Sequence, residues 1–450
     1  MKKLKFDVFV IGSGVAGKTV AEKCKDAGLK VAIAEKREFG GTCSNRGCDP
    51  KKVLLGPTQI LQQATDLMGK GISEVPTLDW KALQKFKKTF TFSIPKRTKK
   101  DFEKKGIEMF HKSPAFISPN VLKVGDVEIT AANIVIATGL VPRKLDIKGS
   151  KHLKVSDDFL SLKKLPKKLI FIGAGYIGLE FAQMASRAGS KVIVMDHGER
   201  PLGAFDSDLA CTIEKVSKDL GIKFIFNSDI ISIKKAKKSF KLSHKIDSKI
   251  TMIKGDLIFN TSGRVPAVTK LNLNEGDVAQ NEQGIAVDEF LRSKTNPSVY
   301  ACGDASDHSL PLSPLAGYEA HIVANNIIEE NDIKINAPLV PSVVFTIPNL
   351  ATVGYSEEEA KRRYKNVTIK YDEVSNWYNN KRINGAAYAY KILINDRTDE
   401  IVGVHLVGPE AGEIINLFTL AMNSKIKASK IKEMLFTYPS WSNDIKAMLS

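Results

Sequence analysis

The chain has 450 residues, 43% of them hydrophobic and 26% charged, which is enough for about three packed domains and excludes a disordered protein. Its 67 basic and 50 acidic residues give a formal net charge of +17, but the lysines are scattered, which argues against a nucleic-acid partner. No stretch reaches the roughly 18 uncharged apolar residues of a membrane span, and five cysteines are too few for a disulfide framework, so we expect a cytoplasmic protein.

The chain opens on a strand pattern that leads into a glycine-rich turn. Residues 6–11 are apolar apart from Asp7, helical sequence then runs to residue 28, and a second strand ends on an acidic residue. In such a turn the first glycine permits the bend, the second lets backbone approach a pyrophosphate, and the third lets the helix pack on the strand. The acid accepts hydrogen bonds from a ribose diol. The motif consists of Gly12, Gly14, Gly17 and Glu35.

Two cysteines follow in the sequence GGTCSNRGCDPKK. Cys43 and Cys48 are five positions apart, which in an ideal helix separates their Cα atoms by about 8–9 Å, whereas a disulfide requires about 4.4–6.8 Å. The segment must therefore be distorted to form a disulfide, and Gly47 supplies the backbone freedom. Two free thiols or half of a metal site are the alternatives, although no second cysteine–histidine cluster supports zinc. Asp49 should raise the thiol pKa while Arg46 could offset it, and which one dominates stays open.

The middle of the chain repeats the opening pattern. After residues 81–112, whose lysines, Phe and Ile are spaced as in solvated helix faces, the sequence LIFIG enters a second glycine turn and the strand KVIVMD ends at Asp196. This acid follows the third glycine by 18 positions, as Glu35 does in the first copy. One such motif is weak evidence, but two in the same strand–turn–helix context strongly indicate two adenine dinucleotides.

The remaining sequence predicts more strands and a third domain. From Asp196 to about residue 265 we expect short strands and charged turns, followed by the strand VYACGDAS and a linker at 338–341. The sequences VVFTIPNLATVGY, YKILIND and EIVGVHLVG predict antiparallel strands of an α+β domain. Helices are expected at 316–328, 411–422 and 428–435. Three further cysteines occupy helix or strand patterns and are predicted to be inert core thiols: Cys24, Cys211 and Cys302.

These motifs, in this order, are highly specific. With the cysteine motif, both glycine turns, the ATG of residues 137–139, the CGDAS around Asp304 and the GEIIN of the third domain, the chain resembles the FAD-dependent pyridine nucleotide–disulfide oxidoreductases over essentially its whole length. This group includes glutathione reductase, dihydrolipoamide dehydrogenase and mercuric reductase.

The resemblance implies an α/β fold with two Rossmann-like domains, the second inserted in the first, and a C-terminal α+β dimerisation domain. The FAD domain would comprise residues 1–145 and 267–336, the NAD(P) domain 146–266 and the interface domain 337–450. Residues 313–316 would reach the flavin with their backbone. The implied FAD-binding residues are Gly12, Gly14, Gly17, Glu35, Gly41, Thr42, Ala115, Thr138, Gly139, Gly303, Asp304 and Ala316. The implied nicotinamide nucleotide residues are Gly173, Gly175, Tyr176, Gly178, Asp196 and Gly263.

The resemblance also assigns catalytic roles. Cys48 would be the charge-transfer thiol beside the flavin, and Cys43 the interchange thiol that attacks the substrate. Lys52 and Glu180 match an ion pair near flavin N5, although a surface lysine and a surface glutamate are the alternative. Tyr176 matches an aromatic gate over the flavin, although it could instead be a packing residue.

The chain departs from the family in several places. Tyr438 stands where relatives have a catalytic His and Asn443 where they have its Glu partner; the unperturbed pKa of Tyr is about 10 against about 6.5 for His, so the proton chemistry must differ. Val15 and Glu22 replace the Ser and Arg that hold glutathione, and the C-terminus DIKAMLS lacks the cysteine pair of mercuric reductases. The physiological substrate therefore stays open.

These features predict a homodimeric FAD enzyme that uses NAD(P)H to reduce a disulfide-like small molecule, with no bound metal and no membrane or nucleic-acid partner. Asp196 favours NADH because its charge would repel the 2′-phosphate of NADPH, although His197 and Arg200 could attract that phosphate. The alternative is a flavin-dependent reductase of metal ions, quinones or dyes in which the disulfide is only a relay.

Overall fold

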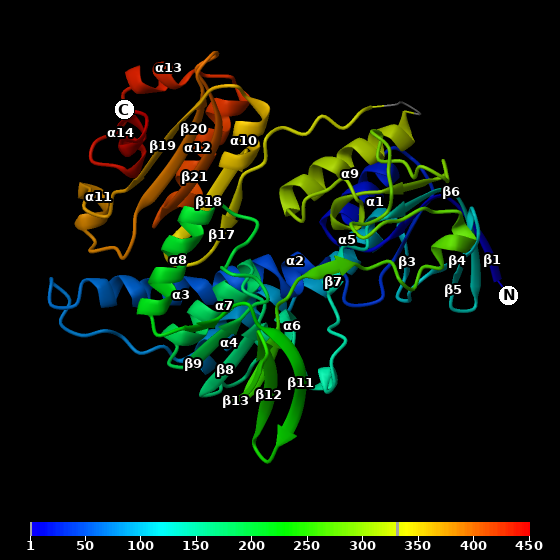
Figure 1. Cartoon of the computed structure of the whole chain (residues 1–450). Helices are drawn as coiled ribbons and strands as arrows, with labels where there is room; N and C mark the ends of the chain where they lie inside the picture. Colours follow the sequence, from blue (N-terminus) through cyan, green and yellow to red (C-terminus); the bar gives the residue numbers. More distant parts are fainter. Residues whose placement is uncertain (1, 330–332) are drawn as a thin grey trace. The chain divides into compact units, whose positions relative to one another are not determined.

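The computed structural model describes residues 2–329 and 333–450, which form two compact units (Figure 1). The first unit contains residues 1–53, 85–143 and 264–337, and the second contains residues 54–84, 144–263 and 338–450. The predicted α/β class is confirmed. Residues 54–84 belong to the second unit, and Leu54, Leu55 and Trp80 are buried in its core. The compact units therefore divide the chain differently from the predicted domains, whose limits stay a prediction.

The first unit is built on a seven-stranded sheet in the order β3-β2-β1-β6-β5-β4, with β16 also paired to β6. Strands β1, β2, β3, β6 and β16 run parallel, as an opening strand–turn–helix unit requires. Helices α1 and α9 pack against each other in this unit. Its elements are β1 Lys2–Ile11, α1 Val15–Asp26, β2 Val31–Ala34, α2 Gly41–Arg46, α5 Ile94–Lys105, β3 Glu108–Phe110, β4 Ala115–Ser118, β5 Val121–Val124, β6 Val127–Ile136, β7 Leu140–Pro142, β15 Arg264–Pro266, β16 Val299–Ala301 and α9 Ser313–Ile328.

The second unit contains the repeated motif in a parallel sheet of order β10-β9-β8-β14. A separate antiparallel sheet of three strands, β11 to β13, lies between β10 and β14 in the chain. The elements of this part are α6 Ser156–Leu160, β8 Lys168–Ile172, α7 Tyr176–Arg187, β9 Lys191–Met195, α8 Ser207–Asp219, β10 Lys223–Ile225, β11 Asp229–Ala236, β12 Ser239–Ile246, β13 Lys249–Gly255 and β14 Leu257–Asn260. Two long helices, α3 Cys48–Asp66 and α4 Trp80–Thr91, continue from one unit's residues into the other's.

Helix α8 was not expected, because residues 196–265 were predicted to contain only strands and turns. Asp206 caps the helix by accepting hydrogen bonds from two backbone N–H groups. Leu209, Ile213 and Val216 are buried at helical spacing. The charged residues between them had hidden this apolar stripe.

The C-terminal part of the second unit is an antiparallel sheet of order β17-β18-β21-β20-β19, with helix α12 packed on it. The predicted antiparallel strands and the two predicted helices are confirmed. The elements are β17 Ser342–Val344, β18 Asn349–Gly354, α10 Glu357–Arg363, β19 Val367–Glu373, α11 Tyr378–Lys381, β20 Ala389–Asn395, β21 Glu400–Gly408, α12 Ala411–Asn423, α13 Ala428–Glu433 and α14 Asp444–Met448.

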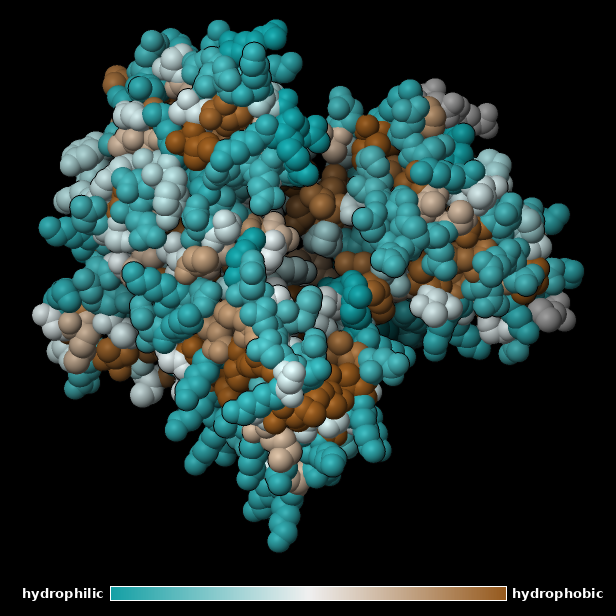
Figure 2. Space-filling model, in the orientation of Figure 1, coloured by the Kyte–Doolittle hydropathy of each residue, from teal (hydrophilic) through white to brown (hydrophobic). Residues whose placement is uncertain are grey.

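Hydrophilic side chains prevail on the face shown in Figure 2, and apolar ones form smaller groups there. Among the helices of the described ranges, none combines the length and apolar character needed to cross a membrane.

Candidate active site

The first glycine turn holds its acidic residue by backbone hydrogen bonds. Oε2 of Glu35 accepts the N–H of Ser13 at 3.1 Å, and Oε1 accepts the N–H of Arg37 at 2.8 Å. Gly12 has a φ of 107°, and a Cβ there would lie 2.3 Å from the carbonyl oxygen of Ala137. The turn thus requires glycine and fixes a carboxylate beside the N-terminus of α1, where a nucleotide ribose and pyrophosphate fit.

The second turn repeats this geometry. Oδ2 of Asp196 accepts the N–H of Ala174 at 2.6 Å, and Oδ1 accepts the N–H of Gly198 at 2.8 Å. Gly173 has the same φ of 107° as Gly12, and a Cβ there would lie 2.4 Å from the carbonyl oxygen of Thr261. The internal repeat predicted from the sequence is therefore also a repeat of hydrogen bonds.

Some of the other predicted cofactor residues lie beside the first turn. A Cβ on Gly41 would come within 2.3 Å of Gly14, so two backbone segments meet where a side chain would block them. The hydroxyl of Thr138 is buried without a hydrogen-bond partner among the described residues. Such an unsatisfied group fits a site that a polar cofactor completes. Gly17, Gly175 and Gly178 belong to the two turns, whereas Ala115 lies in β4 at the edge of the first unit's sheet. The cofactor roles of Thr42, Ala115, Gly139 and Gly263 stay predictions.

A buried glutamate supports the loop that contains Asp304. Oε2 of Glu319, in α9, accepts the N–H of Gly303 at 2.7 Å, and a Cβ on Gly303 would contact Ala316 at 3.1 Å. Burial raises the pKa of Glu319 to about 7, and burial also raises the pKa of Asp304. Sequence reasoning did not identify Glu319, because its contact with Gly303 spans 16 positions.

The two cysteines meet at a break between helices. Helix α2 ends at Arg46, Gly47 leaves the helical conformation and α3 begins at Cys48, so the expected distortion is present. Both cysteines are free thiols in the structure. The hydroxyl of Ser313, at the start of α9, lies 3.4 Å from Sγ of Cys43 and 3.8 Å from Sγ of Cys48. From the sequence, only the backbone of residues 313–316 was expected to take part in the site. No local pattern links the Ser313 side chain to the cysteines.

The two thiols titrate differently. The hydrogen bond from Cys43 is the main cause that lowers the pKa of Cys48 to about 6, and Ser313 and the charge of Lys51 lower it further. The same hydrogen bond and burial raise the pKa of Cys43. The charge of Asp49 raises the pKa of Cys48, but its effect is weaker than that of Lys51. At neutral pH the pair therefore shares one proton, which stays on Cys43.

Arg46 was considered as the cation that offsets the effect of Asp49 on the thiol pKa, but it is not among the main causes that set the pKa of either thiol. Its guanidinium forms an ion pair with Glu38 and lowers the pKa of that carboxyl, after the effect of a backbone hydrogen bond. The cation that offsets Asp49 is instead Lys51, three positions after Cys48.

The proposed charge pair near the flavin comes from two units. Lys52 is exposed in α3 of the first unit, and Glu180 is 1% exposed in α7 of the second. Oε1 of Glu180 accepts the N–H of Phe345 at 2.8 Å. Tyr176, the predicted gate, begins α7 and is 38% exposed. The pairing and the gate stay predictions.

Tyr438 lies on the surface of the second unit. It is 71% exposed, and its ring stacks on Tyr378 with centroids 6.4 Å apart. The nearby carboxylate of Asp444 accepts hydrogen bonds from Asn379 at 3.0 Å and from the hydroxyl of Tyr388 at 3.2 Å. The Tyr438 side chain is thus largely exposed, whereas the carboxylate of Asp444 is hydrogen-bonded within its own unit.

The expectation of three core thiols is wrong for one of them. Cys24 and Cys302 are buried, and burial raises the pKa of Cys24 to about 12. Cys211 is exposed, because it lies in α8 on the side opposite the buried stripe.

Comparison with known proteins covers nearly the whole chain. The family model described as pyridine nucleotide-disulphide oxidoreductase matches residues 6–320, and the model of its dimerisation domain matches residues 340–449. A glutathione reductase of Burkholderia cepacia is 30% identical over 99% of this chain and 98% of its own length. A mercuric reductase of Staphylococcus aureus is 29% identical over 98% of this chain and 81% of its own length. The solved HOCl-induced flavoprotein disulfide reductase RclA from Escherichia coli is 26% identical, with a TM-score of 0.87 over 98% of this chain and 99% of that one.

Proposed function

Because the chain belongs to the pyridine nucleotide-disulphide oxidoreductase family, we propose that it is an NADH-dependent reductase that acts on a small disulfide through Cys43 and Cys48. Flavoprotein disulfide reduction with NAD(P)H is the activity of the family. The observation that carries the finer proposal is the dithiol at Gly47, where one hydroxyl, that of Ser313, reaches both sulfurs.

The residues around the two nucleotide turns fit FAD and a nicotinamide nucleotide. Glu35 and Asp304 would hold FAD at its ribose and its ribityl chain, and Thr138 offers an unsatisfied hydroxyl nearby. Bound at these residues, FAD would supply hydride acceptance from the nicotinamide and two-electron reduction of the Cys43–Cys48 disulfide to the thiol pair.

The thiols then carry those electrons to the substrate. Cys43 gives up its proton as its sulfur attacks one sulfur of the substrate disulfide and forms a mixed disulfide, and the other half leaves as a thiolate that takes up this proton. The Cys48 thiolate attacks Cys43, re-forms the Cys43–Cys48 disulfide and releases the second thiolate. Ser313 donates a hydrogen bond to whichever sulfur is charged, and Lys51 favours that charge on Cys48.

The low pKa of Cys48 predicts a pH-dependent spectrum. Enzyme reduced by two electrons should show a long-wavelength charge-transfer band between the Cys48 thiolate and oxidised FAD. The thiolate exists above its pKa, so the band should fade as the pH falls through about 6. Ser313→Ala removes one stabilising hydrogen bond and should move this midpoint upward. Absorbance titration of both proteins checks this, and a midpoint near the ordinary thiol pKa in the wild type would contradict it.

Nucleotide choice follows from the second turn. Arg200 could have attracted the 2′-phosphate of NADPH, but its guanidinium donates to the carbonyl oxygens of Leu202 at 3.1 Å and Phe205 at 3.2 Å. Asp196 is therefore the charge that faces the ribose. We expect kcat/KM for NADH to exceed that for NADPH, and Asp196→Ala to reduce this ratio about tenfold, as expected when a like-charge contact is lost. A higher kcat/KM for NADPH in the wild type would contradict the assignment.

The substrate and assembly are proposed from the same features. Glu22 stands where relatives have the Arg that holds glutathione, and it pairs with Lys18 at 3.6 Å. A carboxylate cannot bind the carboxylates of glutathione disulfide as that Arg does, so we propose another small disulfide as substrate. A homodimer, which the matched dimerisation domain suggests, would use exposed residues such as Leu420 and Tyr438. The reducing cytoplasm is the proposed location.

A further inference from the structure

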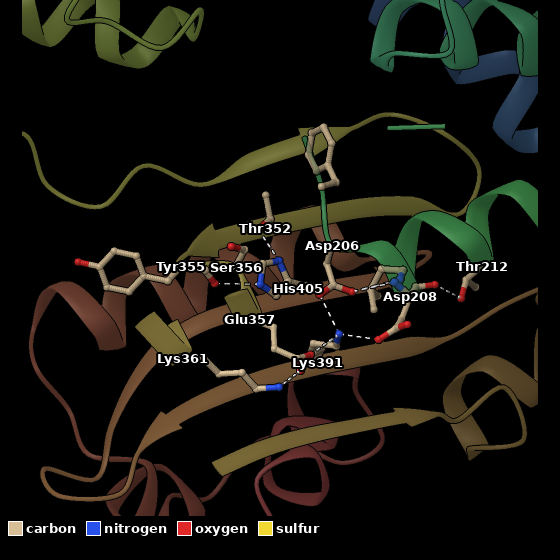
Figure 3. Close-up of polar contacts among 12 residues, drawn as sticks. Asp206, Asp208, Thr212, Thr352, Tyr355, Ser356, Glu357, Lys361, Lys391 and His405 are labelled. Atoms are coloured by element: carbon tan, nitrogen blue, oxygen red, sulfur yellow. Dashed lines mark hydrogen bonds and ion pairs between the residues drawn. The ribbon is translucent and has the colours of Figure 1, made fainter. Parts of the chain in front are cut away.

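One buried cation joins the nucleotide-binding part of the second unit to its five-stranded sheet. Lys391, in β20, is 2% exposed, and its Nζ lies 2.8 Å from a carboxylate oxygen of Asp206. Asp208 and Glu357 provide two further carboxylates, at 2.5 and 2.9 Å (Figure 3). The first two acids begin α8 and the third begins α10. Asp206 is buried, whereas the side chains of Asp208 and Glu357 are partly exposed, so removing the cation would leave the buried carboxylate of Asp206 without its counter-charge, which is unfavourable.

His405 extends this cluster without adding charge. Its Nε2 lies 3.1 Å from the carbonyl oxygen of Tyr355, which can only accept, so Nε2 carries the proton. The hydroxyl of Thr352 then donates to Nδ1 at 2.7 Å. Burial lowers the pKa of His405 and so favours this neutral form. Lys391 is therefore the buried cation that balances Asp206 and Asp208, while Glu357 also pairs with the exposed Lys361 at 2.6 Å.

Asp206 ends the segment that begins with the nucleotide acid, Asp196. One oxygen of Asp206 caps α8 by accepting the N–H of Asp208 at 3.1 Å, while the other meets Lys391. Within the segment, Arg200 donates to the carbonyl oxygens of Leu202 and Phe205. Segment 196–206 is thus held together internally and anchored at its far end by Lys391.

The segment is also bonded back to the glycine turn. The N–H of Leu202 donates to the carbonyl oxygen of Ala174 at 3.0 Å. The N–H of the same Ala174 donates to Asp196 at 2.6 Å. A continuous set of hydrogen bonds and ion pairs therefore runs from Lys391 through Asp206 and segment 196–206 to the carboxylate of Asp196.

We propose that Lys391 is a positioning residue for the nicotinamide nucleotide: by holding Asp206 it fixes segment 196–206 and thereby the carboxylate of Asp196. The inference rests on the proposed role of Asp196 in binding the ribose. Without the cation, the carboxylates at the start of α8 repel one another and the anchored end of the segment moves. Affinity for the nucleotide should therefore decrease, whereas the thiols should not be affected, because they and their hydrogen bonds belong to the other unit.

The test uses the full-length FAD-loaded protein and the dissociation constant of NAD⁺ measured by calorimetry. Lys391→Met, which keeps the length of the side chain but not its charge, should weaken binding about fivefold to tenfold, within the usual range of coupling between sites. The kcat at saturating NADH should change less than about twofold, because a high concentration of NADH compensates for weaker binding. Lys391→Arg keeps the charge and should keep the dissociation constant within about twofold of the wild type.

A matched control separates positioning from general loss of stability. Ile415→Ala removes buried atoms from α12 of the same unit and leaves the charges of the cluster in place, so it should not change NAD⁺ binding. Methylammonium should restore binding to Lys391→Ala, by supplying the missing charge in the space of the side chain, but should not affect Ile415→Ala. If Lys391→Met does not fold, Asp206→Asn can be used instead. It weakens the same ion pair and should also raise the dissociation constant of NAD⁺.

The outcomes distinguish this inference from the proposed function. If Asp196→Ala does not change the affinity or selectivity for the nucleotide, the proposed role of Asp196 is wrong. If Asp196→Ala weakens binding while Lys391→Met and Asp206→Asn leave it unchanged, the role of Lys391 is overturned and the function stands. Equal weakening by Lys391→Met and Ile415→Ala would also overturn it.

Discussion

Replacing Cys43 by serine is expected to reduce kcat/KM for disulfide substrates by about a thousandfold or more, because a hydroxyl cannot form the mixed disulfide. The thiolate of Cys48 does not depend on substrate contact. Reduction of a dye that takes electrons directly from the flavin should therefore stay within about twofold of the wild type. Reactive thiols counted after reduction should exceed those before it by two in the wild type.

The matched control is Cys211→Ser, which removes an exposed thiol from α8. It should leave both activities unchanged and lower the thiol count equally before and after reduction. A panel of small disulfides, metal ions, quinones and dyes should be tested as acceptors with each variant. It shows which acceptors take electrons from the Cys43–Cys48 pair and which take them directly from the flavin. If the best acceptor of the wild type is reduced equally well by Cys43→Ser, the disulfide is not the route to it, and the flavin-level alternative holds.

The repeated motif was the most predictable part of the fold, because residues close together in the sequence determine its structure. A strand, three spaced glycines and an acid at a constant offset define one hydrogen-bonded turn. Glu35 and Asp196 accordingly accept N–H groups from equivalent positions, those of Ser13 and Ala174. The break at Gly47 was predictable for a similar reason, since the spacing of the cysteines is incompatible with a straight helix.

Long-range contacts were not predictable from local rules. Ser313 reaches Cys43 across 270 positions, and a serine at the start of a helix is ordinarily read as a cap. Lys391 is a charged residue within an apolar strand pattern, which gives no sign that Asp206 will neutralise it from 185 positions away. Arg46 was considered for the thiols because it is near in sequence, but the fold places Glu38 beside it. In each case the tertiary partner, rather than the residue type, decides the role.

Tyr438→Phe is expected to slow the substrate half-reaction about tenfold to a hundredfold. If the C-terminal domain forms the dimer interface, this exposed hydroxyl approaches the Cys43–Cys48 pair of the other subunit. As a neutral donor it would stabilise the thiolate that leaves the substrate, by about 1.5–3 kcal/mol for a hydrogen bond to a charged group. The rate at which NADH bleaches the flavin absorbance should stay unchanged, because the hydroxyl acts on the substrate side.

Stopped-flow measurement of both half-reactions tests this role. The alternative is that Tyr438 only packs between Phe436 and Trp441 at the interface. In the single chain its side chain is 71% exposed and stacks on Tyr378. Tyr378→Leu removes that stacking partner and serves as the control for surface packing, with a smaller effect expected. The pH profile of kcat should show no inflection near about 6–7 other than that of the Cys48 thiol, because no catalytic His is present to add one. An unchanged substrate half-reaction in Tyr438→Phe would mean that Tyr438 is only a packing residue and that the group that assists the leaving thiolate is still to be identified.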